Sequence, residues 1–485
     1  MRTRPVPRPT LGSLRLALGA ALLPAALAAQ TPAAQPPTSA SPASAPEPPR
    51  PPAPGAPKEF RLPPKRVVAL DNGMRLVMVP FGAVPRALVR LEVRTGMIDN
   101  PADGAQLAEL TAAMLDQGAG ARTARQIADD AASMGASVDA YAGPDATTVG
   151  GEALAERAPE FLRLVADVAR RPTFPDEQFQ RVRADAVRDR AIAFSQPGTV
   201  ARERFRRVLY GDHPYARLYA SEEALKGYTA DRVRAFYAAN YGARRSTLYV
   251  VGVFDSAAVE RAAREAFAGW AAGPAPTERP PAPKAERSLT LVDRPGAVQS
   301  TINLGLPVPD PSQGDWTALD VTNALLGGSF ASRITSNIRE QKGYTYSPYS
   351  LINARRRSAF WQEAADVTTD KTGASLTEIF KEIDRLRREA PPAAELRGIQ
   401  NYLAGVFTIR NGSRDRVADQ LEFVDLHGLG DSYLTGYVRR TMATTPEDVR
   451  RTAERYLAPE RMTLVVVGDE RTVAPQVAPF ARTSP

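Results

Sequence analysis

The chain has 485 residues, of which 43% are apolar, and its formal net charge is +8. This length exceeds what one hydrophobic core usually organises, so at least two domains are expected. The modest charge, without a basic stripe interleaved with aromatic residues, excludes a typical nucleic-acid-binding protein. Because the chain has no cysteine, disulfides and thiolate metal sites are excluded as well.

The first 29 residues have the pattern of a secretory signal peptide. Four arginines, the last of them Arg15, precede the uncharged run "LALGAALLPAALAA", which ends in small residues. The run is too short to span a bilayer, and its basic flank favours a signal peptide over a buried terminal helix. Its removal lowers the net charge from +8 to +4, since it holds four arginines and no acid. We expect a soluble chain without a membrane span, exported to the periplasm of a diderm bacterium.

Two proline-rich stretches divide the remaining chain. Residues 31–57 hold eleven prolines and almost no large apolar side chain, which predicts a disordered tether. The stretch "GPAPTERPPAPKAER" predicts a linker between two bodies of ordinary domain size. The predicted parts are a signal peptide (1–29), a tether (30–60), an N-terminal domain (61–272), a linker (273–287), a C-terminal domain (288–475) and a tail (476–485).

The first body begins with a hairpin in "RVVALDNGMRLVMVPF", around Asp71, Asn72 and Gly73. A strand in "ALVRLEVRTG" follows, and the apolar spacing then predicts a short helix in "AELTAAMLDQGAG" and another from Thr123. Two strands are expected in "SVDAYAGPDATTVGGEAL", and helices from about residue 157 to residue 210.

The second body begins with a strand, "QSTINLGLPVP", followed by helices in "WTALDVTNALLGG" and "SRITSNIREQKG". Residues 229–252 align without a gap on residues 445–468, each reading as a helix, a loop and a β-rich strand that ends at glycine. Chance hardly produces all three together, so we interpret the chain as a tandem duplication. The fold class is α+β, with a mixed sheet packed against helices in each domain.

Four segments resemble the pitrilysin/insulinase family of zinc peptidases, and in particular its two-chain, processing-peptidase type. They are "LDNGMRLVMVP", "TARQIADDAASMGASVDAYAGPDATTV", "YGDHPYAR" and "LLGGSFASRITSNIREQKGYTYSPYS", and the resemblance spans about residues 62–475. It implies that the two domains form half of a clam-shell around a peptide chamber. It also implies that the edge strand in "SVDAYAG" pairs with an extended peptide.

Active members of this family carry H-x-x-E-H on the first helix, where two histidines hold zinc and the glutamate activates its water. The corresponding positions here are Glu109, Ala112 and Ala113, in "ELTAA". The chain has only two histidines, His213 and His427, which lie in different bodies. Asp189 falls near the family's distal carboxylate ligand, but one acid without partners is better read as a solvated helix residue. No zinc is therefore expected in this chain.

Arg339 and Tyr346, in "REQKGYTY", match a pair that contacts the substrate peptide near the zinc in this family. A guanidinium and a phenol can both donate hydrogen bonds to a peptide carbonyl or an oxyanion. A helix from Ser332 through Arg339, ended by Gly343, and a following strand would bring Tyr346 back beside Arg339. Without the resemblance, the two residues would be read as a helix-end charge and a half-buried aromatic.

The resemblance implies a divided enzyme, because the family has two-chain members in which one chain carries the zinc helix and the other the Arg/Tyr pair. The chain is then the non-zinc subunit of an exported heterodimeric zinc metalloendopeptidase. An H-x-x-E-H homologue would be its partner and would hold the zinc, while Arg339 and Tyr346 bind the peptide and stabilise the transition state. The alternative is a non-catalytic peptide-binding or scaffold protein of the cell envelope.

Overall fold

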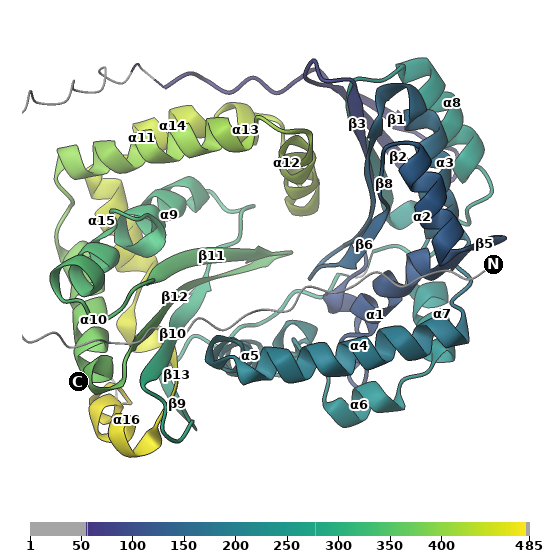
Figure 1. Cartoon of the computed structure of the whole chain (residues 1–485). Helices are drawn as coiled ribbons and strands as arrows, with labels where there is room; N and C mark the ends of the chain where they lie inside the picture. The colour runs from purple at the N-terminus through teal and green to yellow at the C-terminus, as the bar shows by residue number, and fades with distance from the viewer. Residues whose placement is uncertain (1–54, 56, 277, 482–485) are drawn as a thin grey trace, which may run out of the picture. The chain divides into compact units, whose positions relative to one another are not determined.

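A six-stranded sheet organises the first half of the chain in the computed structural model, which describes residues 55, 57–276 and 278–481 (Figure 1). The predicted signal peptide and most of the predicted tether lie outside these residues. The strand order is β1-β2-β8-β3-β7-β6. The strands are β1 (Arg66–Ala69), β2 (Arg75–Pro80), β3 (Arg86–Val93), β6 (Asp139–Ala142), β7 (Thr147–Leu154) and β8 (Ser246–Gly252). Strands β4 (Gly118–Ala119) and β5 (Arg122–Thr123) form a separate small ribbon.

The predicted hairpin is the pair β1 and β2, which run antiparallel. Gly73 turns the chain with φ +88°, a left-handed conformation that suits glycine. The Asn72 side chain donates a 2.8 Å hydrogen bond from Nδ2 to the Phe267 carbonyl, which ties the turn to the end of a helix. Strand β8 is buried along its whole length, as expected of a strand inside the sheet with both faces covered.

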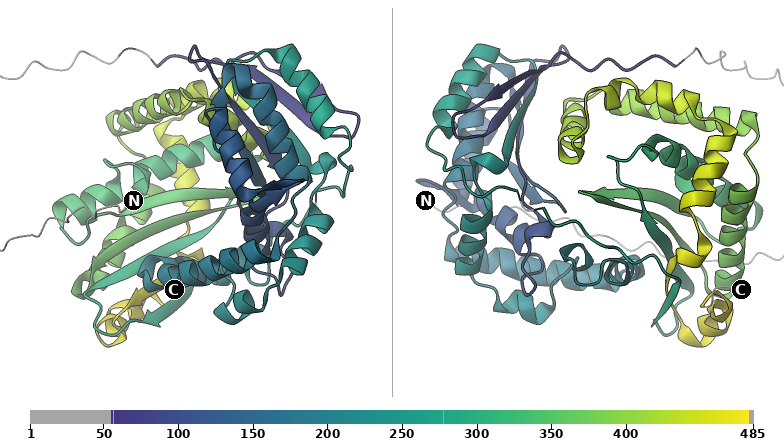
Figure 2. Two further views of the ribbon diagram at one scale, coloured as in Figure 1. Left: turned by 45° about the vertical axis from the view of Figure 1, so that its right-hand side comes forward. Right: turned by 180° about the vertical axis from the view of Figure 1, so that it is seen from behind.

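Helices cover one face of this sheet, with α3 and α8 packed side by side against β3 and β2 (Figures 1 and 2). Their apolar faces join one large core that also takes in α1 and α7. The helices of this half are α1 (Leu107–Met114), α2 (Ala124–Ser133), α3 (Ala158–Arg170), α4 (Asp176–Ser195), α5 (Pro197–Tyr210), α6 (Glu222–Gly227), α7 (Ala230–Asn240) and α8 (Ser256–Phe267).

The second half contains a five-stranded sheet in the order β11-β12-β10-β13-β9. Its strands are β9 (Ser288–Asp293), β10 (Gln299–Val308), β11 (Tyr349–Arg355), β12 (Ser358–Thr368) and β13 (Thr463–Gly468). Its helices are α9 (Trp316–Asn323), α10 (Thr372–Arg388), α11 (Ala393–Arg410), α12 (Arg414–His427), α13 (Ser432–Thr435), α14 (Tyr437–Ala443), α15 (Pro446–Tyr456) and α16 (Glu470–Val477). Helices α9, α10 and α15 supply the core on one face.

The repeat found in the sequence is also present in the structure. Helix α7 leads to β8 as α15 leads to β13, and Thr229 and Thr445 cap the two helices with their side chains. Strand β8 runs parallel to β2 and antiparallel to β3, and β13 has the same relation to β9 and β10. The predicted α+β class with two similar mixed sheets is confirmed, whereas the exact domain boundaries stay predictions.

Each half contributes one helix that packs against the sheet of the other half. Helix α5 packs Ala201, Phe205 and Leu209 against Phe360 of β12 and against β13. Helix α12 packs Val417, Ala418 and Leu421 against Leu88, Tyr249 and Val251 of the first sheet. Each of these two helices covers a sheet face that the other half's own helices leave exposed. Each half therefore completes the hydrophobic core of the other.

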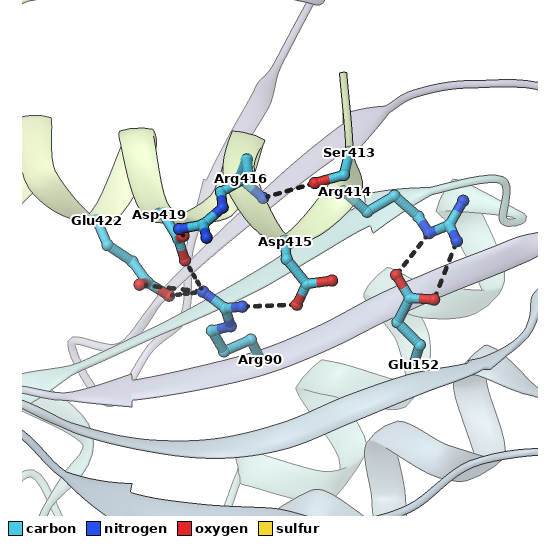
Figure 3. A network of polar contacts seen from close by, with 8 residues as sticks. All are labelled: Arg90, Glu152, Ser413, Arg414, Asp415, Arg416, Asp419 and Glu422. Atoms are coloured by element: carbon cyan, nitrogen blue, oxygen red, sulfur yellow. Dashed lines mark hydrogen bonds and ion pairs between the residues drawn. The ribbon is translucent and has the colours of Figure 1, made fainter. Parts of the chain in front are cut away.

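Charged residues surround the contact between α12 and the first sheet (Figure 3). Arg90 of β3 donates to Asp415 at 2.8 Å, to Asp419 at 2.7 Å and to Glu422 at 3.3 Å. Arg414 makes a two-bond pair with Glu152, at 2.8 and 2.9 Å. Because Arg90 has only 12% of its side chain exposed, three acids rather than water compensate its charge.

Candidate functional site

The helix that corresponds to the zinc-binding helix is present as α1, and its degenerate positions lie beside a cavity. The cavity has a volume of about 510 Å³ and is lined by residues of α1, α4 and the segment after His213, among them Glu109, Leu110, Ala113, Asp185, Asp189 and Tyr219. Ala112 is fully buried, and Ala113 is exposed. Burial raises the pKa of the Glu109 carboxyl, which accepts a 3.4 Å hydrogen bond from Asn100.

These residues do not fit a catalytic zinc ion. Two alanines stand where zinc peptidases of this type need the base and a histidine, and an alanine offers no donor atom. Asp189 is 69% exposed on its side chain, with a weak 3.9 Å ion pair to Arg188. Across the described residues, no cluster of three or more histidine, cysteine or acidic side chains has a geometry that could hold a metal ion.

The two histidines have local structural contacts instead. His213 caps the short turn Pro214–Ala216, where its Nδ1 accepts a 3.2 Å hydrogen bond from the Tyr215 backbone. His427 is the last residue of α12 and is buried, and burial lowers its pKa to about 4. An imidazole with this pKa is neutral at pH 7, and its ring packs against Phe423 at 4.6 Å between centroids.

Arg339 lies near the end of a helical segment that has π-helical geometry over Thr335–Gln341. The sequence predicts an ordinary helix over 332–339, but the observed helix begins at Arg333, and its last turns are widened. The segment is anchored from the neighbouring helices. Arg333 pairs with Glu395 of α11 through two 2.8 Å bonds, and Asn337 donates to Glu378 and Glu382 of α10 at 2.9 and 2.8 Å. Widened turns of this kind recur at functional sites.

Tyr346 returns to Arg339 through a loop rather than the predicted strand. Gly343 turns the chain at φ +65°, and Tyr344 donates a 2.8 Å backbone bond to Ile338. Thr345 forms an isolated bridge with Val367, while the next strand, β11, begins only at Tyr349. The Arg339 guanidinium carbon lies 5.2 Å from the centroid of the Tyr346 ring. The expected proximity of the two residues is therefore observed.

A third side chain, Phe330, completes this cluster and was not anticipated from the sequence. Its ring lies 4.5 Å from the Arg339 guanidinium carbon, so Arg339 contacts two aromatic rings. Phe330 and Tyr346 are 69% and 80% exposed, which is unusual for large aromatic side chains. The only signal in the sequence was the position of Phe330 after the glycine pair of "LLGGSF".

No hydrogen bond, ion pair or ring contact in the described part of the chain joins this cluster to Glu109, Ala112 or Ala113. The structure thus presents two separate features: a cavity beside a helix without ligands, and an exposed Arg/Tyr/Phe cluster. Strand β6, the expected peptide-pairing edge, does lie at one edge of the first sheet and pairs only with β7 among the described strands. None of the helices in the described ranges is both long and apolar enough to cross a bilayer.

Comparisons with known proteins agree with this reading of the fold. A family model described as Insulinase (Peptidase family M16) matches residues 83–221, and one described as Peptidase M16 inactive domain matches residues 227–403. An uncharacterized zinc protease of Streptomyces coelicolor is 23% identical over 412 residues, which cover 83% of this chain and 89% of that protein. One of Mycobacterium tuberculosis is 27% identical over 300 residues, or 60% of this chain and 67% of that protein.

Solved structures are similar over most of the chain. The peptidase M16 inactive domain from Pseudomonas fluorescens superposes with a TM-score of 0.77 at 25% identity, over 84% of this chain and 98% of that one. A protease from Helicobacter pylori gives 0.79 at 20% identity, over 84% and 100%, and supports the fold alone. The chain therefore belongs to the pitrilysin/insulinase family of peptidases, and its described residues do not form the family's zinc site.

Proposed function

We propose that this chain is the non-zinc subunit of an exported heterodimeric zinc metalloendopeptidase. In this proposal a homologous partner chain with an H-x-x-E-H helix holds the zinc ion. The present chain contributes Arg339 and Tyr346 to peptide binding and to stabilisation of the transition state. The names of its relatives as zinc proteases and its own lack of zinc ligands together favour a divided site over an independent enzyme.

The observation that carries the proposal is the contact of the half-buried Arg339 with the exposed Tyr346. Among the described residues Arg339 has one ion pair, to Glu340 at 3.3 Å. Its side chain is 25% exposed and contacts the rings of Phe330 and Tyr346. Within the described residues the Tyr346 hydroxyl has no hydrogen-bond partner, and the side chain is 80% exposed. A guanidinium and a phenol can each donate a hydrogen bond to a peptide carbonyl oxygen.

Peptide hydrolysis places negative charge on that oxygen in the transition state, and fixed donors stabilise this charge without reorganisation. Zinc in the partner would supply the activated water. Arg339 and Tyr346 would orient the scissile carbonyl and donate hydrogen bonds to its oxygen as charge develops. This division leaves the partner chain inactive without a donor pair and the present chain inactive without a nucleophile.

The test is to purify the mature chain and an H-x-x-E-H homologue encoded in the same genome, and to assay each alone and mixed. Cleavage of a mixed peptide library, bound zinc and complex mass are measured for all three samples. The proposal predicts zinc in the partner, none in this chain, and cleavage that requires both. Cleavage or stoichiometric zinc in this chain alone contradicts it. A mixture that neither associates nor cleaves, while this chain still binds peptides, favours the peptide-binding or scaffold alternative.

A further inference from the structure

Arg206 of α5 is buried and has no acidic partner among the described residues, in contrast to several half-buried arginines of the chain. Only 4% of its surface is exposed, and its Nε has no hydrogen-bond partner. Its contacts are the faces of two rings, with the guanidinium carbon 4.3 Å from the Phe360 centroid and 5.9 Å from that of Tyr210. Elsewhere Arg90 contacts three acids, Arg333 pairs with Glu395 and Arg414 pairs with Glu152.

The charged groups nearest to Arg206 are mostly positive. Arg202, which is exposed, precedes it by one turn of α5, and the half-buried Arg355 ends strand β11. Burial, and then Arg355, lower the pKa of Arg206 to about 9. Arg355 also has a buried Nε without a partner, while its other nitrogens contact the Ala354 carbonyl and Asn353.

The acids of this region have hydrogen-bond or ion-pair partners of their own, and the charge of Arg355 also acts on Asp145. Asp145 accepts hydrogen bonds from the Tyr215 hydroxyl and, at 3.3 Å, from the Arg356 backbone. Glu203 pairs with Arg207, and Asp366 accepts from Thr301. Within the described residues no carboxylate forms an ion pair with Arg202, Arg206 or Arg355. A buried cation without an anion is strongly unfavourable unless a ligand supplies the opposite charge.

A small cavity lies beside Arg202, one helical turn before Arg206. It has a volume of about 70 Å³ and lies between α5 and the second sheet, where Arg202, Asn303, Tyr349, Gln362 and Asp366 line it. The Asn303 Oδ1 is buried and has no partner in the structure. Strand β11, which carries Tyr349 and Arg355, is the edge strand of its sheet. An extended chain beside β11 would pass this cavity.

We propose that Arg202, Arg206 and Arg355 form a carboxylate-binding site between α5 and strands β11 and β12, and that its ligand is the free carboxylate of a peptide. Arginine suits this role because its planar N–H groups match the two oxygens of a carboxylate. The choice of a peptide rests on the proposed function, whereas the preference for a carboxylate rests on the three arginines alone. The site involves neither Arg339 nor Tyr346.

The experiment uses the full mature chain without any partner and two probes, a short peptide with a free C-terminus and the same peptide amidated. Binding is measured by calorimetry at low ionic strength, with inorganic phosphate as a third probe. We expect the free-acid peptide to bind at least about tenfold more tightly than the amide, since the amide leaves the arginines uncompensated. Equal binding of the two peptides, or tighter binding of phosphate than of the free acid, overturns the carboxylate assignment.

The variant Arg206→Met removes the buried charge and keeps most of the side-chain volume. We expect it to lose the preference for the free acid, whereas Arg204→Met, on the exposed face of the same helix, keeps it. Without a probe, Arg206→Met should melt at or above the wild-type temperature, because an uncompensated charge is gone. If Arg206→Met fails to fold, Arg355→Met must lose the preference instead.

A preference that survives these substitutions, or that Arg204→Met abolishes equally, overturns the assignment of the site. If the unmodified chain shows no preference for the free acid while Arg339→Ala still impairs a reconstituted peptidase, only the carboxylate site is refuted. If the unmodified chain prefers the free acid but Arg339→Ala leaves the reconstituted peptidase fully active, the divided enzyme is refuted and the carboxylate site is supported.

Discussion

At the scale of single residues, Phe330 is the side chain whose role the structure defines most clearly. It is too exposed to serve the core, yet its ring lies 4.5 Å from the Arg339 guanidinium carbon. A cation on an aromatic face gains about 0.5–1 kcal/mol at exposed sites. That energy restrains a long side chain that otherwise samples many rotamers, so Phe330 acts as a positioning residue.

Phe330→Leu should therefore lower kcat/KM of the reconstituted peptidase about two- to tenfold, by releasing Arg339 from its bound orientation. Phe330→Tyr keeps an aromatic face and should restore most of the activity. Steady-state kinetics of both variants check this expectation. If the leucine and tyrosine variants have the same rate as each other, the ring does not position Arg339.

The neighbours of Gly327 leave no room for a side chain at this position. A Cβ at this position would lie 2.6 Å from Glu363 Oε2 and 2.7 Å from Ser350 Oγ, closer than side-chain carbons approach such atoms. Glu363 is fully buried and cannot move toward water. We expect Gly327→Ala to lower the free energy of unfolding by about 1–3 kcal/mol, as overpacking does.

Denaturant unfolding measures this effect, and Gly398→Ala in α11 is its matched control. A Cβ at Gly398 meets nothing within 4 Å, so the substitution should leave stability unchanged or raise it by up to about 1 kcal/mol. An equal loss of stability in both variants would show that the crowding at Gly327 is not the cause.

At the scale of elements, the exchanged helix α12 depends on Arg90. Removal of this side chain would leave Asp415, Asp419 and Glu422 facing one another across a partly buried contact. Arg90→Met should destabilise the chain by about 3 kcal/mol, because one partner of a buried charge network is lost. The amide protons of α12 should then exchange faster than those of α5.

Arg416→Met is the comparison for this experiment, since Arg416 is 62% exposed and pairs only with Asp419 among the described residues. It should change stability by less than about 1 kcal/mol. Hydrogen exchange that speeds up equally in α5 and α12 of the Arg90 variant would indicate global unfolding rather than release of α12.

Glu92 is the next residue after Arg90 on the same face of β3, and it makes the contact between α12 and the first sheet sensitive to pH. Burial, reinforced by Glu422, raises the pKa of its carboxyl from 4.5 to about 8. Between about pH 4.5 and pH 8, Glu92 is protonated in the folded state and ionised in the unfolded chain. Its contribution to stability is present below about pH 4.5 and decreases by up to about 1.4 kcal/mol per pH unit as the pH rises toward 8.

Unfolding free energies of the wild type and Glu92→Gln from pH 5 to pH 8.5 test this dependence. The groups that face Glu92 are Glu422 and Asp425 of α12, Tyr249 of β8 and Arg94, which directly follows β3. Glu92→Gln should remove most of the decline, because glutamine does not titrate. A decline of the same slope in both proteins would assign the effect to other groups, such as the buried Glu363.

At the scale of the whole molecule, periodic patterns predicted the architecture well. Apolar alternation and the Asp71, Asn72 and Gly73 turn gave the first hairpin, and the repeated helix, loop and strand gave both sheets. Contacts between segments distant in sequence were not predictable in this way. The acids around Arg90 lie more than 300 positions from it in the sequence. Helices α5 and α12 likewise pack against strands of the other half of the chain.

The candidate site was predicted only in part for the same reason. Spacing and family resemblance located Arg339 and Tyr346, since both lie within one continuous segment. The widened turns over Thr335–Gln341 and the stacking of Phe330 depend on anchors in α10 and α11, which local propensity does not encode. The uncompensated Arg206 became visible only when its surroundings in the second sheet were known.

The central claim is that this chain supplies the donors of an active site whose zinc lies in another chain. The most direct measurement is kcat of the mixed complex with Arg339→Ala, compared with Arg397→Ala, an exposed arginine of α11. The account predicts a loss of about 10²–10³-fold for Arg339→Ala, as for removal of one oxyanion donor, and full activity for Arg397→Ala. A complex that assembles and cleaves at the wild-type rate with Arg339→Ala would contradict the account.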